Sequence, residues 1–143
     1  MTDQFLSGTW LGTATYGDNY PESLKGKQAP FELTIKAADG SFSGTCEDEI
    51  TKPHLLTPAS INGFVEDGFI SFIKQYPYRF HLKEDGSVET DMERNHPEIH
   101  YSGMFNEETN TFSGIWEIEV IIEEGIENNL SYFLSGNWEI KKA

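Results

Sequence analysis

The residues of this sequence best suited to chemistry are a carboxylate, an amine and several phenols that follow apolar residues at a spacing of two. Asp48 stands two residues after Cys46, and Lys74 stands two residues after Phe72. Residues two apart in a β-strand point to the same face, so this spacing predicts that Asp48 and Lys74 point inward. The same argument applies to four tyrosines: Tyr16, Tyr76, Tyr78 and Tyr101. Together these side chains would be the polar contacts of an apolar pocket, the usual form of a small-molecule site.

Two interpretations of Asp48 and Lys74 are open. In the first, the two charges pair at the mouth of a cavity, because an unpaired charge is costly to bury. In the second, simpler interpretation, both residues lie in water at the ends of their strands. Asp48 is also the one inward carboxylate that could serve as an acid or base, so a small barrel isomerase or cyclase is a further hypothesis.

One short segment, His-Pro-Glu-Ile-His starting at His96, has metal-like spacing. On a strand, His96, Glu98 and His100 would share a face, and two imidazoles with a carboxylate could chelate zinc or iron. Ile99 and the apolar residues that follow it claim the inward face, however, and Pro97 favours a turn or a strand edge. We therefore expect a solvated strand start here and no metal site.

The net charge of −14 limits the partners that this chain can have. Nucleic acids and anionic membranes would be repelled, so neither is expected as a partner. A basic protein partner remains an alternative, and an acidic inhibitor-like module with a filled core would use Glu117, Glu119 and the residues 123–127. Solubility alone also accounts for the charge.

Cys46 is the only cysteine, so no internal disulfide can form, and an inward cysteine on a core strand is predicted to be inert packing. The first residues show no basic region followed by a long apolar stretch, and no window approaches the ~20 apolar residues of a membrane helix. We expect a cytoplasmic protein without a cofactor.

The apolar residues alternate with polar ones, which is typical of half-buried antiparallel strands. Asp-Gly pairs that favour tight hairpin turns separate several of these segments, for example at Asp39 and Asp67. Ordinary helical periodicity is not found, and residues 17–29 are expected to form a loop or, less favourably, a short helix. The expected strands lie near residues 6–16, 30–37, 41–48, 58–66, 69–75, 77–82, 87–92, 98–105, 111–122 and 130–141.

A five-residue motif recurs along these segments: an apolar residue, Ser, Gly, any residue, then a large or apolar residue. By parity the glycine shares the inward face with the large residues, which leaves room where a strand bends sharply. Repeated inward glycines are typical of a tightly coiled, closed barrel rather than a flat sheet. The copies are residues 6–10, 42–46, 101–105, 112–116 and 134–138, with a degenerate copy at 61–65.

These motifs carry a family resemblance. Gly8 and Trp10 on the first strand resemble the Gly-x-Trp of lipocalins and of their calycin relatives, the fatty-acid-binding proteins and avidins, and the repeated Ser-Gly segments look especially avidin-like. Gly8, Trp10 and Gly12 followed by Tyr20-Pro21 also look like the opening of nitrobindin-type haem barrels. The resemblance implies a barrel with a ligand cavity. No histidine follows His100, so the axial haem ligand of nitrobindins has no matching position, and no functional residue is carried over from these families.

The sequence therefore predicts an all-β fold: a single antiparallel up-and-down β-barrel of eight to ten strands, calycin-like, spanning residues 1–143. The leading functional hypothesis is a non-catalytic barrel that binds a small apolar or aromatic molecule. Its predicted polar contacts are Tyr16, Asp48, Lys74, Tyr76, Tyr78 and Tyr101.

Overall fold

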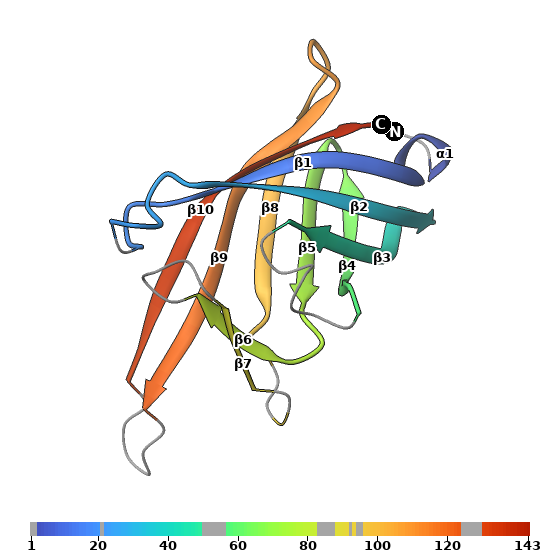
Figure 1. Cartoon of the computed structure of the whole chain (residues 1–143). Coiled ribbons are helices and arrows are strands. Elements are labelled where there is room, and N and C mark those ends of the chain that lie inside the picture. The colour runs from blue at the N-terminus through green and yellow to red at the C-terminus, as the bar shows by residue number, and fades with distance from the viewer. Residues whose placement is uncertain are drawn as a thin grey trace.

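The structure is a computed structural model that describes residues 3–20, 22–49, 57–82, 88–91, 93, 96–123 and 130–143 (Figure 1). One short helix precedes a series of strands whose positions match those expected from the alternation. The elements are α1 (Asp3–Leu6), β1 (Gly8–Tyr16), β2 (Gln28–Ala38), β3 (Ser41–Asp48), β4 (Ala59–Glu66), β5 (Phe69–Gln75), β6 (Arg79–Leu82), β7 (Val88–Asp91), β8 (Ile99–Asn106), β9 (Thr111–Glu123) and β10 (Leu130–Lys142).

Eight of these strands form a closed antiparallel barrel in the order β1-β10-β9-β8-β5-β4-β3-β2. Neighbours in the barrel are neighbours along the chain, except that β5 pairs directly with β8 and β1 with β10. The intervening β6 and β7 pair only with each other in a separate two-stranded sheet among the described residues. Pairing of β1 with β10, with Trp10 opposite Lys142, closes the barrel. The predicted calycin-like, up-and-down fold class is confirmed by this topology.

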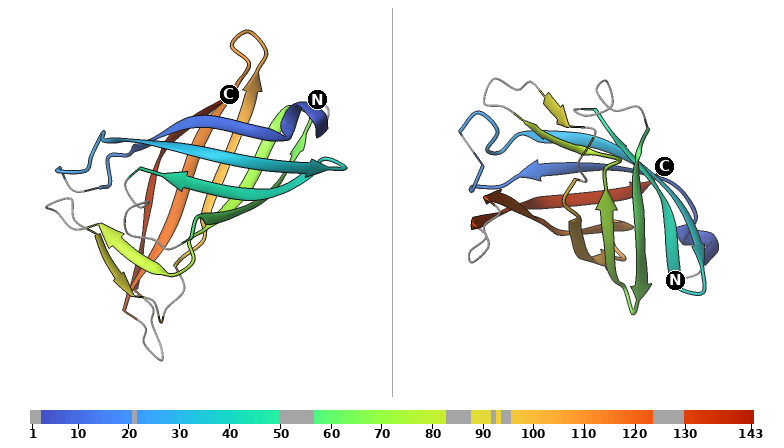
Figure 2. Two further views of the ribbon diagram at one scale, coloured as in Figure 1. Left: turned by 45° about the vertical axis from the view of Figure 1, so that its right-hand side comes forward. Right: turned by 90° about the horizontal axis from the view of Figure 1, so that it is seen from below.

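The two ends of the barrel differ. At one end, tight turns join β2 to β3, β4 to β5 and β8 to β9, and α1 lies over this end beside both chain termini (Figures 1 and 2). The Asp3 carboxylate accepts hydrogen bonds from the backbone N–H groups of Asp39 (2.8 Å) and Gly40 (3.2 Å), which ties α1 to the β2–β3 turn. The opposite end carries the longer connections, including the β6–β7 hairpin. We call these the closed end and the open end.

Aromatic rings fill the interior near the closed end. Trp10 is fully buried, donates its indole N–H to the Leu6 carbonyl at 2.8 Å, and packs against Phe5 and Phe112 with ring centroids 5.7 and 5.6 Å apart. Farther along the barrel, Trp138 packs edge-on against Phe72 and Tyr101. The apolar faces of the eight barrel strands thus meet around one continuous core.

The repeated glycines allow this tight coiling. A Cβ atom on Gly44 would lie 1.8 Å from the Thr34 carbonyl oxygen, and one on Gly114 would lie 1.9 Å from the Ser102 carbonyl oxygen. Gly63, Gly103 and Gly136 show the same close approach to a neighbouring strand. The predicted role of the glycines as bend positions is confirmed for these copies.

Gly8, the glycine of the first copy of the motif, does not have this role. Gly8 has a φ of +127°, and an added Cβ would meet only the Lys142 side chain. On β1 the close approach falls at Gly12 instead, where a Cβ would lie 2.6 Å from the Glu139 carbonyl oxygen. The expectation for Gly8 was wrong because Gly8 begins the strand, where the neighbouring backbone does not yet crowd it.

Candidate functional site

A buried ion pair lies inside the barrel toward its open end. Asp48 is the last residue of β3 and Lys74 is the last inward residue of β5, so both lie where their strands reach the open end. Lys74 is 4% exposed and Asp48 is 6% exposed. The Lys74 Nζ atom lies 3.5 Å from Asp48 Oδ2. The interpretation of both residues as solvated strand ends is therefore wrong.

Two tyrosines complete this polar cluster. Tyr76, which directly follows β5, donates its hydroxyl hydrogen to Asp48 Oδ2 across 2.5 Å. The Lys74 ammonium lies over two rings, 4.5 Å from the centroid of Tyr76 and 6.0 Å from that of Tyr101. The faces of aromatic rings carry negative charge and attract a cation at these distances. Tyr101 in turn stacks on Phe72, with centroids 4.6 Å apart and an interplanar angle of 10°, so the filled core fixes its position.

The surroundings decide which of these groups stay charged. Burial by itself lowers the pKa of Lys74, but the negative forms of Cys46, Tyr101, Tyr76 and Asp48 raise the pKa well above its usual value. Lys74 therefore remains an ammonium at neutral pH, with the Asp48 carboxyl oxygen Oδ2 at 3.5 Å. Burial raises the pKa of Tyr101 to about 12 and that of Tyr76 well above 10, so both phenols keep their protons at neutral pH.

Three further rings gather where β1, β9 and the segment after β1 meet. Tyr16, at the end of β1, packs against Tyr20 and Trp116 with centroids 4.7 and 5.9 Å away, and Tyr20 lies 5.8 Å from Trp116. Gly136 pairs with both Trp116 and Tyr16, and a Cβ there would lie 2.7 Å from the Trp116 ring. The missing side chain thus admits the indole between the strands. Tyr16 and Tyr20 are partly exposed, unlike the ion pair.

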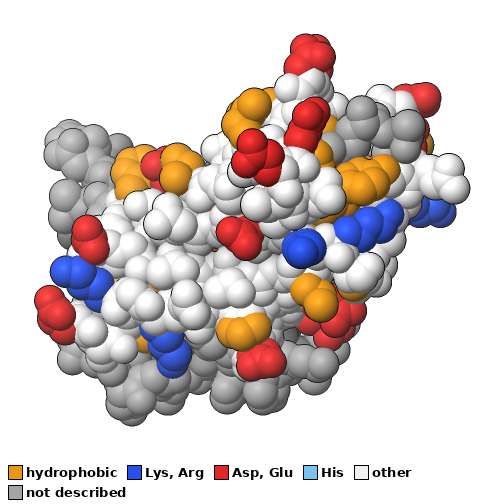
Figure 3. Space-filling view, turned by 90° about the horizontal axis from the view of Figure 1, so that it is seen from above, with side chains coloured by type: hydrophobic (Ala, Val, Ile, Leu, Met, Phe, Trp, Pro, Cys, Tyr) orange, Lys and Arg blue, Asp and Glu red, His pale blue; other side chains and the backbone are white. Residues whose placement is uncertain are grey.

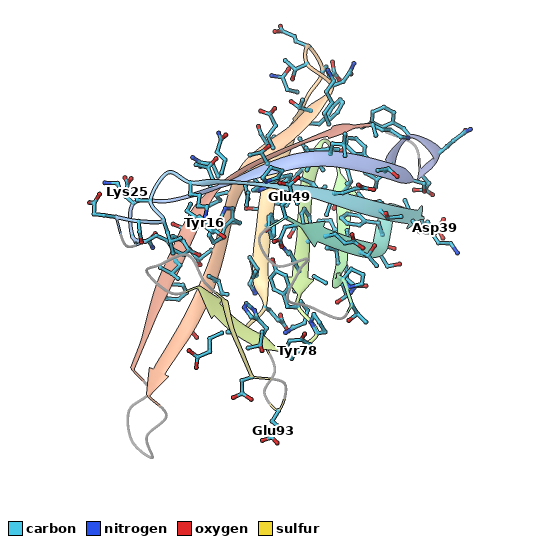
Figure 4. The ribbon with its side chains drawn as sticks, in the orientation of Figure 1. Tyr16, Lys25, Asp39, Glu49, Tyr78 and Glu93 are labelled. Carbon is cyan, nitrogen blue, oxygen red and sulfur yellow. The ribbon has the colours of Figure 1, made fainter. Side chains whose placement is uncertain are left out.

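Tyr16 is electrostatically linked to the polar cluster. Burial raises the pKa of Tyr16 to about 12, and the Asp48 charge adds to this while Lys74 opposes it. Figure 4 shows Tyr16 at the opposite end of the β1–β2–β3 layer from Asp39, which marks the closed end. Tyr78 is also buried, but the contacts that can be described for the ion pair are made by Tyr76 and Tyr101. The place of Tyr78 in the site stays a prediction.

Sequence reasoning missed His96 as a member of this region. His96 is 6% exposed, and its ring lies edge-on to Tyr76 with centroids 4.9 Å apart. The Gln75 side chain also donates to the His96 carbonyl. Glu98 and His100 are exposed as expected, with 3.9 Å between His100 Nε2 and Glu98 Oε2. Pro97 interrupts the alternation, so parity could not show that His96 turns inward.

Cys46 lies beside the same cluster. Its side chain is buried, and burial raises the pKa of the thiol, while the nearby Lys74 ammonium acts in the opposite direction. A raised pKa keeps the thiol protonated and unreactive at neutral pH. In the described part of the chain, no group of three or more His, Cys, Asp or Glu side chains is placed to hold a metal ion.

The outer face of the barrel carries both acidic and apolar side chains. Glu117, Glu119 and Glu139 are exposed on β9 and β10. Exposed apolar residues lie on the outer surface as well: Leu11, Phe64, Phe69, Met104, Ile115 and Phe133. On the face shown in Figure 3, carboxylates, lysines and apolar side chains are interspersed rather than gathered into separate patches.

The fold and the cluster together define an eight-stranded barrel with a polar, tyrosine-lined open end. Scans against protein families and against curated proteins find no match. Among solved structures, one described as "Crystal structure of rhizavidin" aligns with a TM-score of 0.46 and 11% sequence identity, over 93% of this chain and 83% of that chain.

Within the described residues, no helix has the length and hydropathy needed to span a membrane.

Proposed function

We propose that this barrel binds a small, largely apolar or aromatic molecule at its open end without transforming it. The observation that carries the proposal is the Asp48–Lys74 pair, buried with the Tyr76 hydroxyl 2.5 Å from Asp48 at the end that α1 does not cover. Tyr16, Tyr76, Tyr78 and Tyr101 are the proposed further contacts. No cofactor is part of the proposal.

The cost of the ion pair supports a binding role. Removing two charges from water is expensive, and apolar residues of similar volume often stabilise a fold equally well or better. A barrel core made only of residues such as Phe72 and Ile61 would not need the pair. A few polar groups within apolar walls are, by contrast, what orients a small ligand.

The packing of the interior limits where a ligand would lie. Trp10, Phe112 and Trp138 occupy the interior from the closed end to the middle of the barrel. The proposed site therefore lies farther toward the open end, between the ion pair and the partly exposed rings of Tyr16 and Tyr20. A ligand would enter past the rings of Tyr16 and Tyr20. The packing of Trp10, Phe112 and Trp138 nearer the closed end would stay unchanged.

Native mass spectrometry of protein purified without added ligand tests the proposal. A retained small molecule, or saturable binding of neutral aromatic probes, is the expected result. The Lys74→Met variant should lose retention or weaken probe binding, whereas Lys36→Met, the same change at an exposed position on β2, should not. A bare mass combined with no binding of any probe would overturn the proposal.

A second candidate function is binding of a basic protein partner through the outer face of β9 and β10. The exposed carboxylates of Glu117, Glu119 and Glu139 favour it. Complex formation with a basic partner that persists at moderate salt would support this function. Binding seen only at low ionic strength would reduce it to general charge attraction.

A further inference from the structure

One outer face of the barrel fits a second copy of this chain. We propose that the outer surface of β4, β5, β8 and β9 is the contact face of a symmetric homodimer. These four strands are neighbours in the barrel and lie side by side in Figure 1. The proposal goes beyond the binding function of the barrel interior and uses none of the interior residues.

Four large apolar side chains are exposed on this face. They are between 39% and 56% exposed, and each lies on a different strand of the four: Phe64, Phe69, Met104 and Ile115. Phe69 lies directly opposite Met104, and the rings of Phe64 and Phe69 are 6.3 Å apart. Ile115 lies diagonally across from Met104 on the next strand. The four side chains therefore form one patch, and an exposed apolar patch is typical of a contact with another protein.

The middle of this face carries no charge, although the chain has 24 acidic residues and a net charge of −14. No Asp, Glu, Lys or Arg is among the outward residues of β5 and β8, two strands that the structure describes completely. Exposed carboxylates lie at the margins instead, for example at Glu66, Asp67 and Glu117. A basic partner would find no opposite charge in the middle of the face. Two copies of this chain, which repel each other elsewhere, can meet here without opposing carboxylates.

The side chains are arranged symmetrically about the seam between β5 and β8. Two rows of directly paired residues cross the four strands from β4 to β9: Phe64, Ser71, Ser102 and Ile115, and, nearer the closed end, Glu66, Phe69, Met104 and Ser113. In the first row the large apolar residues are at the two ends and the serines are at the seam. In the second row the large apolar residues are the two at the seam. Each row therefore has an apolar residue at the same distance on either side of the seam.

A two-fold axis along this seam makes the face complementary to itself. With two copies face to face, Phe64 would lie opposite Ile115 of the partner subunit, and Phe69 opposite Met104 of the partner subunit. Glu66 would lie opposite Ser113 of the partner subunit, so no carboxylate in the two rows would face another. A patch that contacts its own copy is the isologous interface of a C2 dimer, the commonest symmetric oligomer.

The size of the face predicts a transient dimer. Four strands contribute about three residues each, fewer than the about 20–30 residues per side of a standard interface. We therefore expect dimers from roughly micromolar concentrations upward. Salt should strengthen the association, because salt screens the repulsion between two acidic chains and the middle of the contact has no ion pair to weaken. Binding of a basic protein through Glu117 and Glu119 would respond to salt in the opposite way.

Sedimentation velocity of the full chain from micromolar to millimolar concentration, in low and in moderate salt, tests the proposal. We expect a monomer–dimer equilibrium whose dissociation constant falls as the salt concentration rises. Met104→Glu should raise this constant at least about tenfold, because it places a carboxylate in the apolar centre of the contact. Leu11→Glu is the matched control, since Leu11 is similarly exposed but lies on β1, outside this face. The control adds the same charge and should leave the dimer intact.

Two results would overturn the proposal. One is a monomer at every concentration and salt. The other is a dimer that Met104→Glu leaves intact, or that Leu11→Glu weakens equally. Ile115→Glu, at the outer end of the first row, gives a second test of the same face and decides the matter even where Met104→Glu does not fold. Ligand retention in native mass spectrometry is a separate readout, so failure of the dimer leaves the interior binding function standing.

Discussion

The Tyr76 hydroxyl lies 2.5 Å from Asp48 Oδ2 and is the closest described partner of that buried carboxylate. The bond joins the end of β5 to the end of β3, across the intervening β4. The bond therefore attaches the segment between β5 and β6, which leads into the β6–β7 hairpin, to the barrel interior.

Tyr76→Phe should destabilise the protein because the buried carboxylate would lose a hydrogen bond. A hydrogen bond to a charged group contributes about 1.5–3 kcal/mol, and we expect the free energy of unfolding in urea to fall by that amount. A double-mutant cycle with Asp48→Asn serves as the control. Additive effects of the two substitutions would show that the bond contributes nothing.

Removing one charge of the ion pair should cost more than removing both. Lys74→Met leaves Asp48 charged in the core, and breaking a buried pair in this way costs about 3–5 kcal/mol. Asp48→Asn combined with Lys74→Met removes the uncompensated charge, so the double variant should be more stable than the single Lys74→Met variant. Thermal and urea unfolding would measure this order. The reverse order would mean that water reaches the site freely.

Stability should decline in strong alkali because of the buried phenols. Burial raises the pKa of Tyr101 from 10.0 to about 12, so the folded state keeps a proton that the unfolded chain releases. The stabilisation is present below pH 10 and is lost as the pH rises toward 12, by about 2.7 kcal/mol for a shift of two pH units. Tyr16 acts in the same direction. Urea unfolding across this range, compared with Tyr101→Phe, would test it, and the variant should show a shallower decline.

Gly114→Ala should be among the most damaging single methyl additions. The new Cβ would meet the Ser102 carbonyl oxygen at 1.9 Å, and backbone cannot move aside as a flexible side chain can. We expect a loss of at least about 3 kcal/mol, or failure to fold. Gly26→Ala is the matched control, because nothing lies within 4 Å of its Cβ and only its φ of +77° opposes alanine, at a cost of about 1 kcal/mol. Similar losses in both variants would contradict the barrel packing described for Gly114.

Ligand binding at the open end should be reported by one of the three tryptophans. Trp116 contacts Tyr16 and Tyr20, whereas Trp10 lies at the closed end against Phe112. Binding of a neutral aromatic probe should therefore change the emission of Trp116 most strongly. Trp116→Phe should remove most of the fluorescence change, and Trp10→Phe should leave it intact. A signal carried by Trp10 would place the ligand at the wrong end.

The alternation of residues and the inward glycines were enough to predict the closed barrel, because both are local consequences of strand pairing and bending. Parity also gave the inward direction of Asp48 and Lys74 correctly. Parity could not predict how deeply the two side chains are buried. Whether a strand end is covered depends on connections at the open end that come from distant parts of the chain.

Two other features of the structure could not be predicted from local sequence patterns. His96 turns inward after a stretch in which Pro97 breaks the alternation. The β6–β7 hairpin resembles the barrel strands in sequence, and only the direct pairing of β5 with β8 excludes it from the barrel. Pairing partners of this kind are set by competition among many strands, which no single segment records.

The pairing of Trp10 with Lys142 also has a consequence for how the molecule is made. The first strand keeps an unpaired edge until the last strand has emerged from the ribosome, because no earlier segment takes that place. Contacts between such distant residues slow folding and leave an edge exposed to other nascent chains in the meantime. Once β10 has docked, the barrel has no free edge, and the same seam that delays folding protects the finished molecule from edge-to-edge aggregation.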